Sequence, residues 1–155
     1  MSGNAYKRPM RKEFTVGFTV LELMVVTCIA GLLVTLWFPR AARLMDWINT
    51  ERALRDMTTA LAVARHGAVL QATRARLTLS SDTLRIDRLQ AGGWEPWWRR
   101  PGPASHGVVL QVSNPVVVFG PSGIGWGASN TKIVLSRGSQ AETITVSRVG
   151  RVKVW

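Results

Sequence analysis

Residues 17–38 read GFTVLELMVVTCIAGLLVTLWF, an apolar run in which Glu22 is the only charged side chain. As a helix, the 21 residues from Phe18 to Phe38 rise about 31 Å. The hydrocarbon core of a bilayer is about 30 Å thick, so the run predicts one membrane-spanning helix. A carboxylate one turn inside such a helix is costly in lipid unless it has a partner, and it marks a functional position.

The residues on either side of the run predict its orientation. Before the run, basic residues outnumber the one acid, Glu13; they are Lys7, Arg8, Arg11 and Lys12. After the run come Arg40 and Arg43, partly offset by Asp46. This bias places the N-terminus in the cytoplasm and the bulk of the chain on the other side. A secretory signal peptide has a shorter apolar core and a small-residue cleavage site, whereas this run ends in Leu36-Trp37-Phe38-Pro39.

The remainder, residues 39–155, is long enough for one globular domain. The one cysteine, Cys28, lies inside the apolar run, so no disulfide forms within the chain. A net charge of +11 favours anionic partners, either nucleic acid or anionic lipid, without choosing between them.

Hydrophobic periodicity predicts the secondary structure beyond the run. Apolar residues at three- and four-residue steps indicate one long helix from Phe18 to about Ala72; they are Leu54, Met57, Leu61, Ala64 and Ala68. This helix is expected to bend or break briefly near Pro39. The period then becomes two and predicts a β-sheet within residues 75–155, with strands at 75–79, 84–89, 108–112, 116–119, 132–136, 143–147 and 151–154. Segments 92–107 and 120–130 are expected to be loops.

The start of the apolar run carries a second pattern. A basic leader, then Gly17-Phe18-Thr19-Val20-Leu21-Glu22, then an apolar helix resembles the class III signal of type IV pilins and type II secretion pseudopilins. The resemblance implies that a prepilin peptidase removes residues 1–17 by cutting after Gly17, and that Phe18 is then N-methylated. It also implies that Glu22 meets the N-terminal amine of a neighbouring subunit and sets the register of the fibre. The residues alone leave open that Glu22 lies near the lipid headgroups.

Three later segments resemble the GspH/FimT family of minor pilins. LAVARHGAV at residues 61–69 partly matches a helical motif, with His66-Gly67 in place of Ser-Glu. VFGPSG at 118–123 is similar to a family turn, and ITVSRVGRVK at 144–153 is similar to the family's C-terminal ending. With the signal, these matches extend from Gly17 to Lys153.

The resemblance implies an α+β, type IV pilin-like fold. A long N-terminal helix, transmembrane over residues 18–38, would pack on a small antiparallel β-domain within residues 39–155. The implied function is that of a minor subunit that helps initiate or cap the pseudopilus of a type II secretion system or a type IV pilus. The implied partners are other pilins, the peptidase and the inner-membrane assembly platform. The chain would cross the bacterial inner membrane once and place its domain in the periplasm.

The sequence offers no arrangement of residues typical of an enzyme. His66 and His106 are isolated and Cys28 lies in the apolar run, so the spacing of a metal site is missing. The glycine-rich segment GIGWG at 123–127 lacks the Lys-Ser/Thr ending of a phosphate loop. We therefore expect no catalytic residue, no metal and no cofactor.

The C-terminal tail is the first candidate for binding. Its basic residues are Arg148, Arg151 and Lys153, and Arg137 precedes them. In FimT-like proteins of naturally competent bacteria a Gly-Arg-x-Arg tail is implicated in DNA capture, and this chain has Gly150-Arg151-Val152-Lys153. Lysine keeps the charge that phosphate contacts need but loses the bidentate fork of arginine. The alternative is that these residues form the solvated face of an edge strand.

The second candidate lies in the expected loop 92–107. It combines aromatic and basic side chains, namely Trp94, Trp97, Trp98, Arg99 and Arg100. Such side chains dock on neighbouring proteins, stack on unpaired bases, or fold back over their own sheet. The sequence favours docking on another pilin or packing within the domain over nucleic acid.

Overall fold

The computed structural model describes residues 17–127 and 129–155. The chain divides into two units between Phe38 and Pro39. The basic residues of the predicted leader lie outside the described residues.

One helix, α1, spans Val20–Leu70 and continues through Pro39. The predicted long helix is therefore confirmed, and the brief break near Pro39 is not observed. The helix ends in a Schellman motif, because the Thr73 amide donates to the Ala68 carbonyl over 3.1 Å and the Ala72 amide to the Val69 carbonyl over 3.2 Å. Ala72 takes the left-handed conformation that this motif requires, with φ of 50°.

The part of α1 beyond Pro39 buries one stripe of small and apolar residues. The stripe consists of Thr50, Ala53, Met57, Ala60, Leu61, Ala64, Gly67 and Ala68. It contains the predicted core positions except Leu54, which is partly buried. Four alanines and a glycine let the helix backbone approach the sheets closely. A Cβ on Gly67 would lie 2.4 Å from the Trp97 ring, so this position has room for glycine alone.

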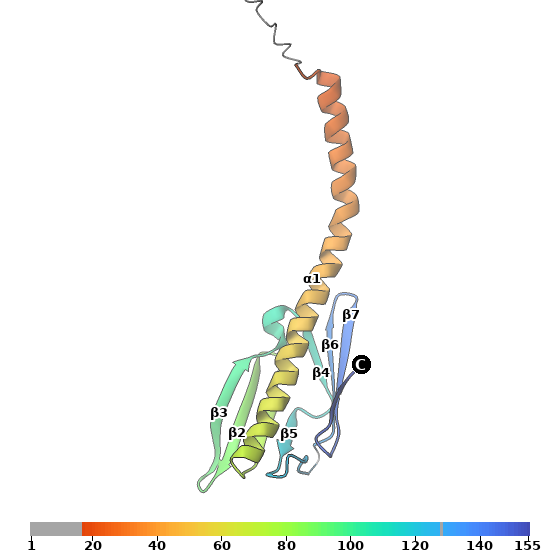
Figure 1. Ribbon diagram of the computed structural model, residues 1–155. Coiled ribbons are helices and arrows are strands. Elements are labelled where there is room, and N and C mark those ends of the chain that lie inside the picture. Colours follow the sequence, from red (N-terminus) through yellow and green to blue (C-terminus); the bar gives the residue numbers. More distant parts are fainter. Residues whose placement is uncertain (1–16, 128) are drawn as a thin grey trace, which may run out of the picture. The chain divides into compact units, whose positions relative to one another are not determined.

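The strands form two antiparallel sheets (Figure 1). The first has the order β3-β2-β1-β5 and the second the order β4-β6-β7-β8. Their bounds are Ala75–Leu79 (β1), Thr83–Gln90 (β2), Gly93–Pro101 (β3), Val109–Val112 (β4), Val116–Phe119 (β5), Thr131–Arg137 (β6), Gln140–Val146 (β7) and Val152–Val154 (β8). Both sheets and the stripe on α1 share one hydrophobic core. The predicted α+β architecture, a long helix packed on antiparallel sheet, is confirmed.

The prediction of a loop at residues 92–107 is wrong. Residues Gly93–Pro101 form β3, the longest strand, and Pro103–His106 form a short 3-10 helix, η1. A bulge in the β2–β3 pairing falls between Ile86 and Asp87, where the register shifts. The extra residue on β3 breaks the two-residue alternation by which a strand is recognised. Two prolines within the same segment also argue against a strand, although they are tolerated here because β3 is an edge strand.

Candidate assembly surface and basic sites

The chain around the predicted cleavage site is non-helical and exposed. Residues 17–19 precede the helix, and Phe18 is 71% exposed. The Thr19 hydroxyl accepts a hydrogen bond from the Glu22 amide over 3.2 Å, which caps the first turn of α1. The Glu22 side chain is exposed and makes no ion pair with any of the described residues. The bond between Gly17 and Phe18 therefore lies outside the helix, and Glu22 is available to a partner.

The first part of α1 exposes its apolar side chains to the surroundings. The described residues of the apolar run are all exposed, and this helix is long and apolar enough to cross a membrane. An exposed apolar surface of this length needs lipid or other protein to cover it.

The aromatic side chains of β3 serve largely in the fold itself. Trp97 and Trp98 pack against the core. Trp97 also meets Gly67 of α1, and the Arg88 guanidinium lies 4.7 Å from its ring centre. Arg76 lies 4.5 Å from the ring centre of Trp94. Of the five residues predicted to form an interface, Arg99 and Arg100 are exposed and the three tryptophans are partly buried.

A buried carboxylate joins β1 and β2. Asp87 is 1% exposed and accepts hydrogen bonds from Arg85 over 2.6 Å and from Arg76 over 2.9 Å. Burial by itself would raise the pKa of Asp87, but the hydrogen bonds and positive charges of Arg85 and Arg76 outweigh it and hold the pKa below its ordinary value. Sequence analysis missed this cluster, although the spacing Arg85-x-Asp87 places both residues on one face of a strand.

The sheet separates the four basic residues that were predicted to bind DNA. Arg137 ends β6 at the β6–β7 hairpin, whereas Arg148 and Arg151 lie in the turn between β7 and β8, at the opposite end of the sheet. Arg137 is also occupied: its Nε donates to Asp46 over 2.9 Å and its guanidinium to the His106 carbonyl. Lys153 lies 3.2 Å from the ring centre of Trp155. Arg137 is thus separated from the other three predicted residues, which lie in the β7–β8 turn and in β8.

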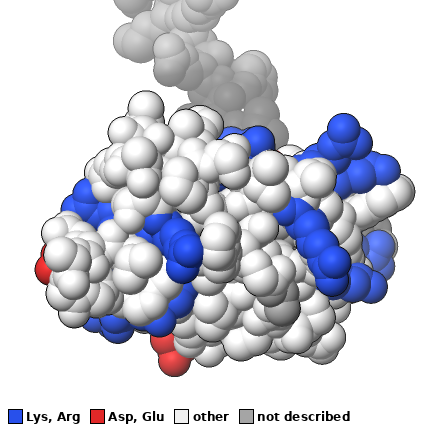
Figure 2. Space-filling model, turned by 90° about the horizontal axis from the view of Figure 1, so that it is seen from below, with Lys and Arg blue, Asp and Glu red and all other residues white. Residues whose placement is uncertain are grey.

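The turn between β7 and β8 borders a groove against α1. The groove has a volume of about 540 Å³, and its polar lining includes Thr58, Arg65, His66 and Arg151. Figure 2 shows two areas of Lys and Arg on one face of the molecule, separated by uncharged side chains, with Asp and Glu only near its margin. The groove and the exposed arginines form a basic surface rather than an enclosed pocket.

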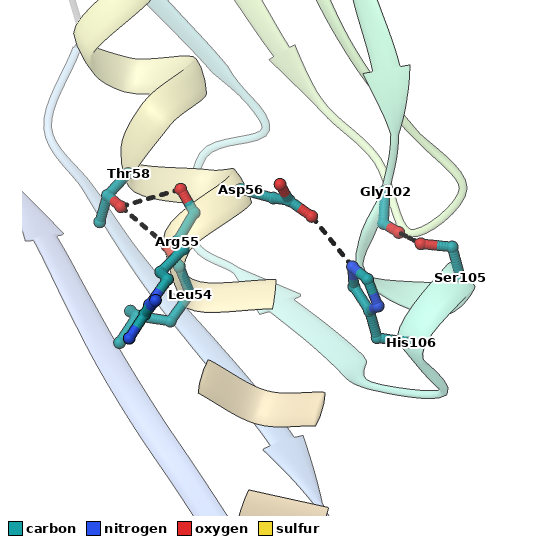
Figure 3. Close-up of polar contacts among 7 residues, drawn as sticks. All are labelled: Leu54, Arg55, Asp56, Thr58, Gly102, Ser105 and His106. Carbon is teal, nitrogen blue, oxygen red and sulfur yellow. Dashed lines mark hydrogen bonds and ion pairs between the residues drawn. The ribbon is translucent and has the colours of Figure 1, made fainter. Parts of the chain in front are cut away.

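A second carboxylate of α1 contacts the short helix η1. The Asp56 carboxylate lies 2.9 Å from His106 Nε2 (Figure 3). His106 is thereby held by α1 through its ring and by Arg137 through its carbonyl oxygen. This contact places His106 within the packing of α1 on the second sheet.

Comparison with known proteins identifies the family. A family model described as Type II transport protein GspH matches residues 53–150. The chain belongs to the GspH family. The matched residues include the stripe on α1 except Thr50, the strands β1 to β7 and the glycine-rich turns. They exclude β8 and the predicted site residues Gly17, Phe18, Glu22, Arg151 and Lys153. A search of curated protein sequences gives no match.

Solved structures share the fold of this GspH-family chain. The type IV minor pilin FimU of Pseudomonas aeruginosa aligns with a TM-score of 0.61 and 14% identity, over 72% of this chain and 92% of FimU. The minor pseudopilin EpsH of the Vibrio cholerae type II secretion system aligns with a TM-score of 0.57 and 14% identity, over 69% of this chain and 96% of EpsH. The fold of the GspH-family chain is therefore that of the minor pilins and pseudopilins.

Within residues 17–127 and 129–155, no three His, Cys, Asp or Glu side chains of the GspH-family chain are grouped so as to hold a metal ion. The family and the fold are those of structural pilin subunits.

Proposed function

We propose that this GspH-family chain is a minor subunit that helps initiate or cap the pseudopilus of a type II secretion system or a type IV pilus. The observation that carries the proposal is the uncovered apolar part of α1, in a chain whose domain has the pilin fold. Such a helix suits two surroundings, a bilayer before assembly and the helices of other pilins after it.

Maturation is the first part of the proposal. A prepilin peptidase cuts after Gly17, and the new N-terminal Phe18 is methylated. The exposure of Phe18 and the position of residues 17–19 before the helix support this, because a protease needs its scissile bond outside a helix. The leader removed would be residues 1–17.

Glu22 is the second part of the proposal. Cleavage creates a cationic amine on Phe18, and Glu22 of one subunit pairs with that amine on its neighbour. A buried carboxylate without a partner is strongly unfavourable, whereas a paired one is tolerated only at one axial position. The pair therefore sets the register between subunits. This role is supported by the exposure of the Glu22 carboxylate, which makes no ion pair within residues 17–127 and 129–155.

The proposed location follows from the same helix. Residues 18–38 cross the bacterial inner membrane with the N-terminus in the cytoplasm, and residues 39–155 form the periplasmic domain. The partners are other pilins or pseudopilins, the prepilin peptidase and the inner-membrane assembly platform.

The decisive experiment compares Gly17→Ala and Glu22→Ala with the wild-type chain in the native host. We expect Gly17→Ala to accumulate as the uncut precursor on gels. We expect Glu22→Ala to be cut normally but to be absent from purified fibres. Glu95→Ala removes an exposed carboxylate of β3 and serves as the matched control. Normal fibre incorporation and normal secretion or piliation in both test variants would refute the proposal.

A further inference from the structure

Four residues of α1 directly after the apolar run form an exposed face, here called the collar. They are Arg40, Arg43, Leu44 and Trp47, at helical positions i, i+3, i+4 and i+7. Residues at these spacings lie on one side of a helix. Leu44 is 55% exposed and Trp47 is 51% exposed. The collar thus presents two cations followed along the helix by two large apolar side chains.

The positive charges of the collar are not neutralised by the acids that follow them. Asp46 pairs with Arg137 over 2.9 Å. Glu51, the next acid along the helix, pairs with Arg55, also over 2.9 Å. Among the described residues, neither collar arginine makes an ion pair. The sequence suggested that Asp46 offsets Arg40 and Arg43, but the fold directs Asp46 to β6 instead.

The spacing of the collar arginines fits the headgroup layer of a bilayer. From Arg40 to Arg43 the helix rises about 5 Å, and Trp47 follows about 6 Å farther on. The headgroup layer on each side of a bilayer is about 5–8 Å thick, with the hydrocarbon between. Since the collar directly follows an apolar run of bilayer length, its cations come where the phosphates lie. Tryptophan is enriched at the membrane–water interface, because its ring is apolar and its N–H is polar.

We propose that the collar binds the phosphate headgroups of anionic phospholipids at the membrane surface on the side of the folded domain. The inference rests on the membrane anchoring contained in the proposed function. Arginine suits phosphate because its planar guanidinium donates two hydrogen bonds at once. A second copy of the chain is a poor occupant of the collar, because Glu22 is the only acid that its residues 18–45 offer to the two arginines. The collar holds the subunit at a fixed depth until it is withdrawn into the fibre.

The test measures lipid preference around the full-length chain. The chain is reconstituted at low protein-to-lipid ratio in vesicles of phosphatidylcholine and phosphatidylglycerol, with bromine on the acyl chains of one lipid at a time. Quenching of tryptophan fluorescence then gives the ratio of association constants for the anionic and the zwitterionic lipid. The test variant is Arg40→Gln/Arg43→Gln. The control, Arg52→Gln/Arg65→Gln, removes the same charge from exposed positions farther along α1.

Each cation near an anionic surface raises the affinity about fivefold. We expect the wild-type chain and the control to prefer phosphatidylglycerol at least fivefold, less so in high salt. The test variant should show a preference at least fivefold weaker than theirs, since beside the apolar run it keeps only the cations that precede that run. The proposal would be overturned if the wild-type chain showed no preference for phosphatidylglycerol, or if the test and control variants lost that preference equally. A preference that appears only at high protein-to-lipid ratio would overturn it too, by assigning the face to contacts between subunits. Membrane anchoring of the wild-type chain is measured separately by flotation and alkaline extraction. A wild-type chain that is not anchored would contradict the proposed function rather than the role of the collar.

Discussion

The Nε of Arg137 donates to the Asp46 carboxylate over 2.9 Å, joining β6 to α1 between residues 91 positions apart in the chain. The same guanidinium binds the His106 carbonyl, and His106 Nε2 meets Asp56. Three elements of the domain are therefore fastened near one end of the helical stripe. Because Arg137 holds these elements together, we expect its removal to lower the stability of the domain rather than to weaken DNA binding.

Replacing Arg137 by Gln leaves the partly buried Asp46 without its cation. The side chains of Arg137 and Asp46 are 32% and 26% exposed, so screening by solvent limits the loss. We expect destabilisation of about 1–2 kcal/mol. Thermal unfolding of the full chain in detergent, followed by near-ultraviolet circular dichroism, measures it. Arg52→Gln, an exposed change on the same helix, should have almost no effect.

Asp87 makes stability depend on pH in the acid range. Its carboxyl pKa is lower in the folded chain than the ordinary value of 3.8, so its contribution is present above pH 3.8 and is lost as the pH falls through the folded pKa. We expect Asp87→Asn to lose about 3 kcal/mol at neutral pH, because Arg76 and Arg85 lose a buried counter-charge. Unfolding midpoints between pH 2 and pH 7 should show a shallower acid dependence in the variant. An unchanged acid dependence would contradict this assignment.

Gly67 and Trp97 are expected to be coupled. A Cβ at Gly67 would lie 2.4 Å from the Trp97 ring, so Gly67→Ala forces the ring or the helix to shift. Overpacking of this kind costs about 1–3 kcal/mol, which exceeds the gain in helix propensity of about 1 kcal/mol. In a Trp97→Leu background the same change should be neutral or stabilising. A double-mutant cycle by thermal unfolding measures the coupling, and additive effects would show that the contact is unimportant.

Ala72 offers a stabilising change. It closes the helix in a left-handed conformation with φ of 50°, which glycine adopts at no steric cost. We expect Ala72→Gly to raise the free energy of unfolding by about 1 kcal/mol. Gln71→Gly, one residue earlier and outside that conformation, should not stabilise the chain.

DNA binding by the tail stays a prediction, and the fold narrows it to Arg148, Arg151 and Lys153. Gel-shift titration of the full chain in detergent against duplex DNA at several salt concentrations tests it. If the tail binds phosphates, Arg151→Gln/Lys153→Gln should weaken binding and reduce the salt slope by about 2. Arg137→Gln should leave the slope unchanged, since that guanidinium is occupied. Absence of salt-sensitive binding by the wild-type chain would end the hypothesis.

The sequence predicted those elements whose signals are local. The apolar run, the stripe on α1 and the β1–β2 hairpin each repeat with a clear period, and all three are present. Strand β3 escaped prediction because a bulge and Pro96 interrupt its alternation. The contact between Trp97 on β3 and Gly67 on α1 could not be predicted either, because no local pattern connects the two elements.

Long-range pairing accounts for the rest of what was missed. Local spacing assigned Asp46 to the arginines beside it, whereas the fold pairs it with Arg137. The pair with Asp46 also separates Arg137 from the other predicted DNA-binding residues. Arg40 and Arg43 then make no ion pair in the part of the chain that the structure describes. A charge pattern along one helix therefore describes the surface only after the contacts from other elements are known.

The cap at the start of α1 bears on how the subunit would tolerate processing. The hydroxyl of Thr19 receives the Glu22 amide, and the Thr19 carbonyl receives the Leu23 amide over 3.1 Å. Every atom in these bonds lies on the C-terminal side of the bond between Gly17 and Phe18. A cut there would leave both of these bonds in place. Processing would then add a charge at the tip of the helix without removing its cap.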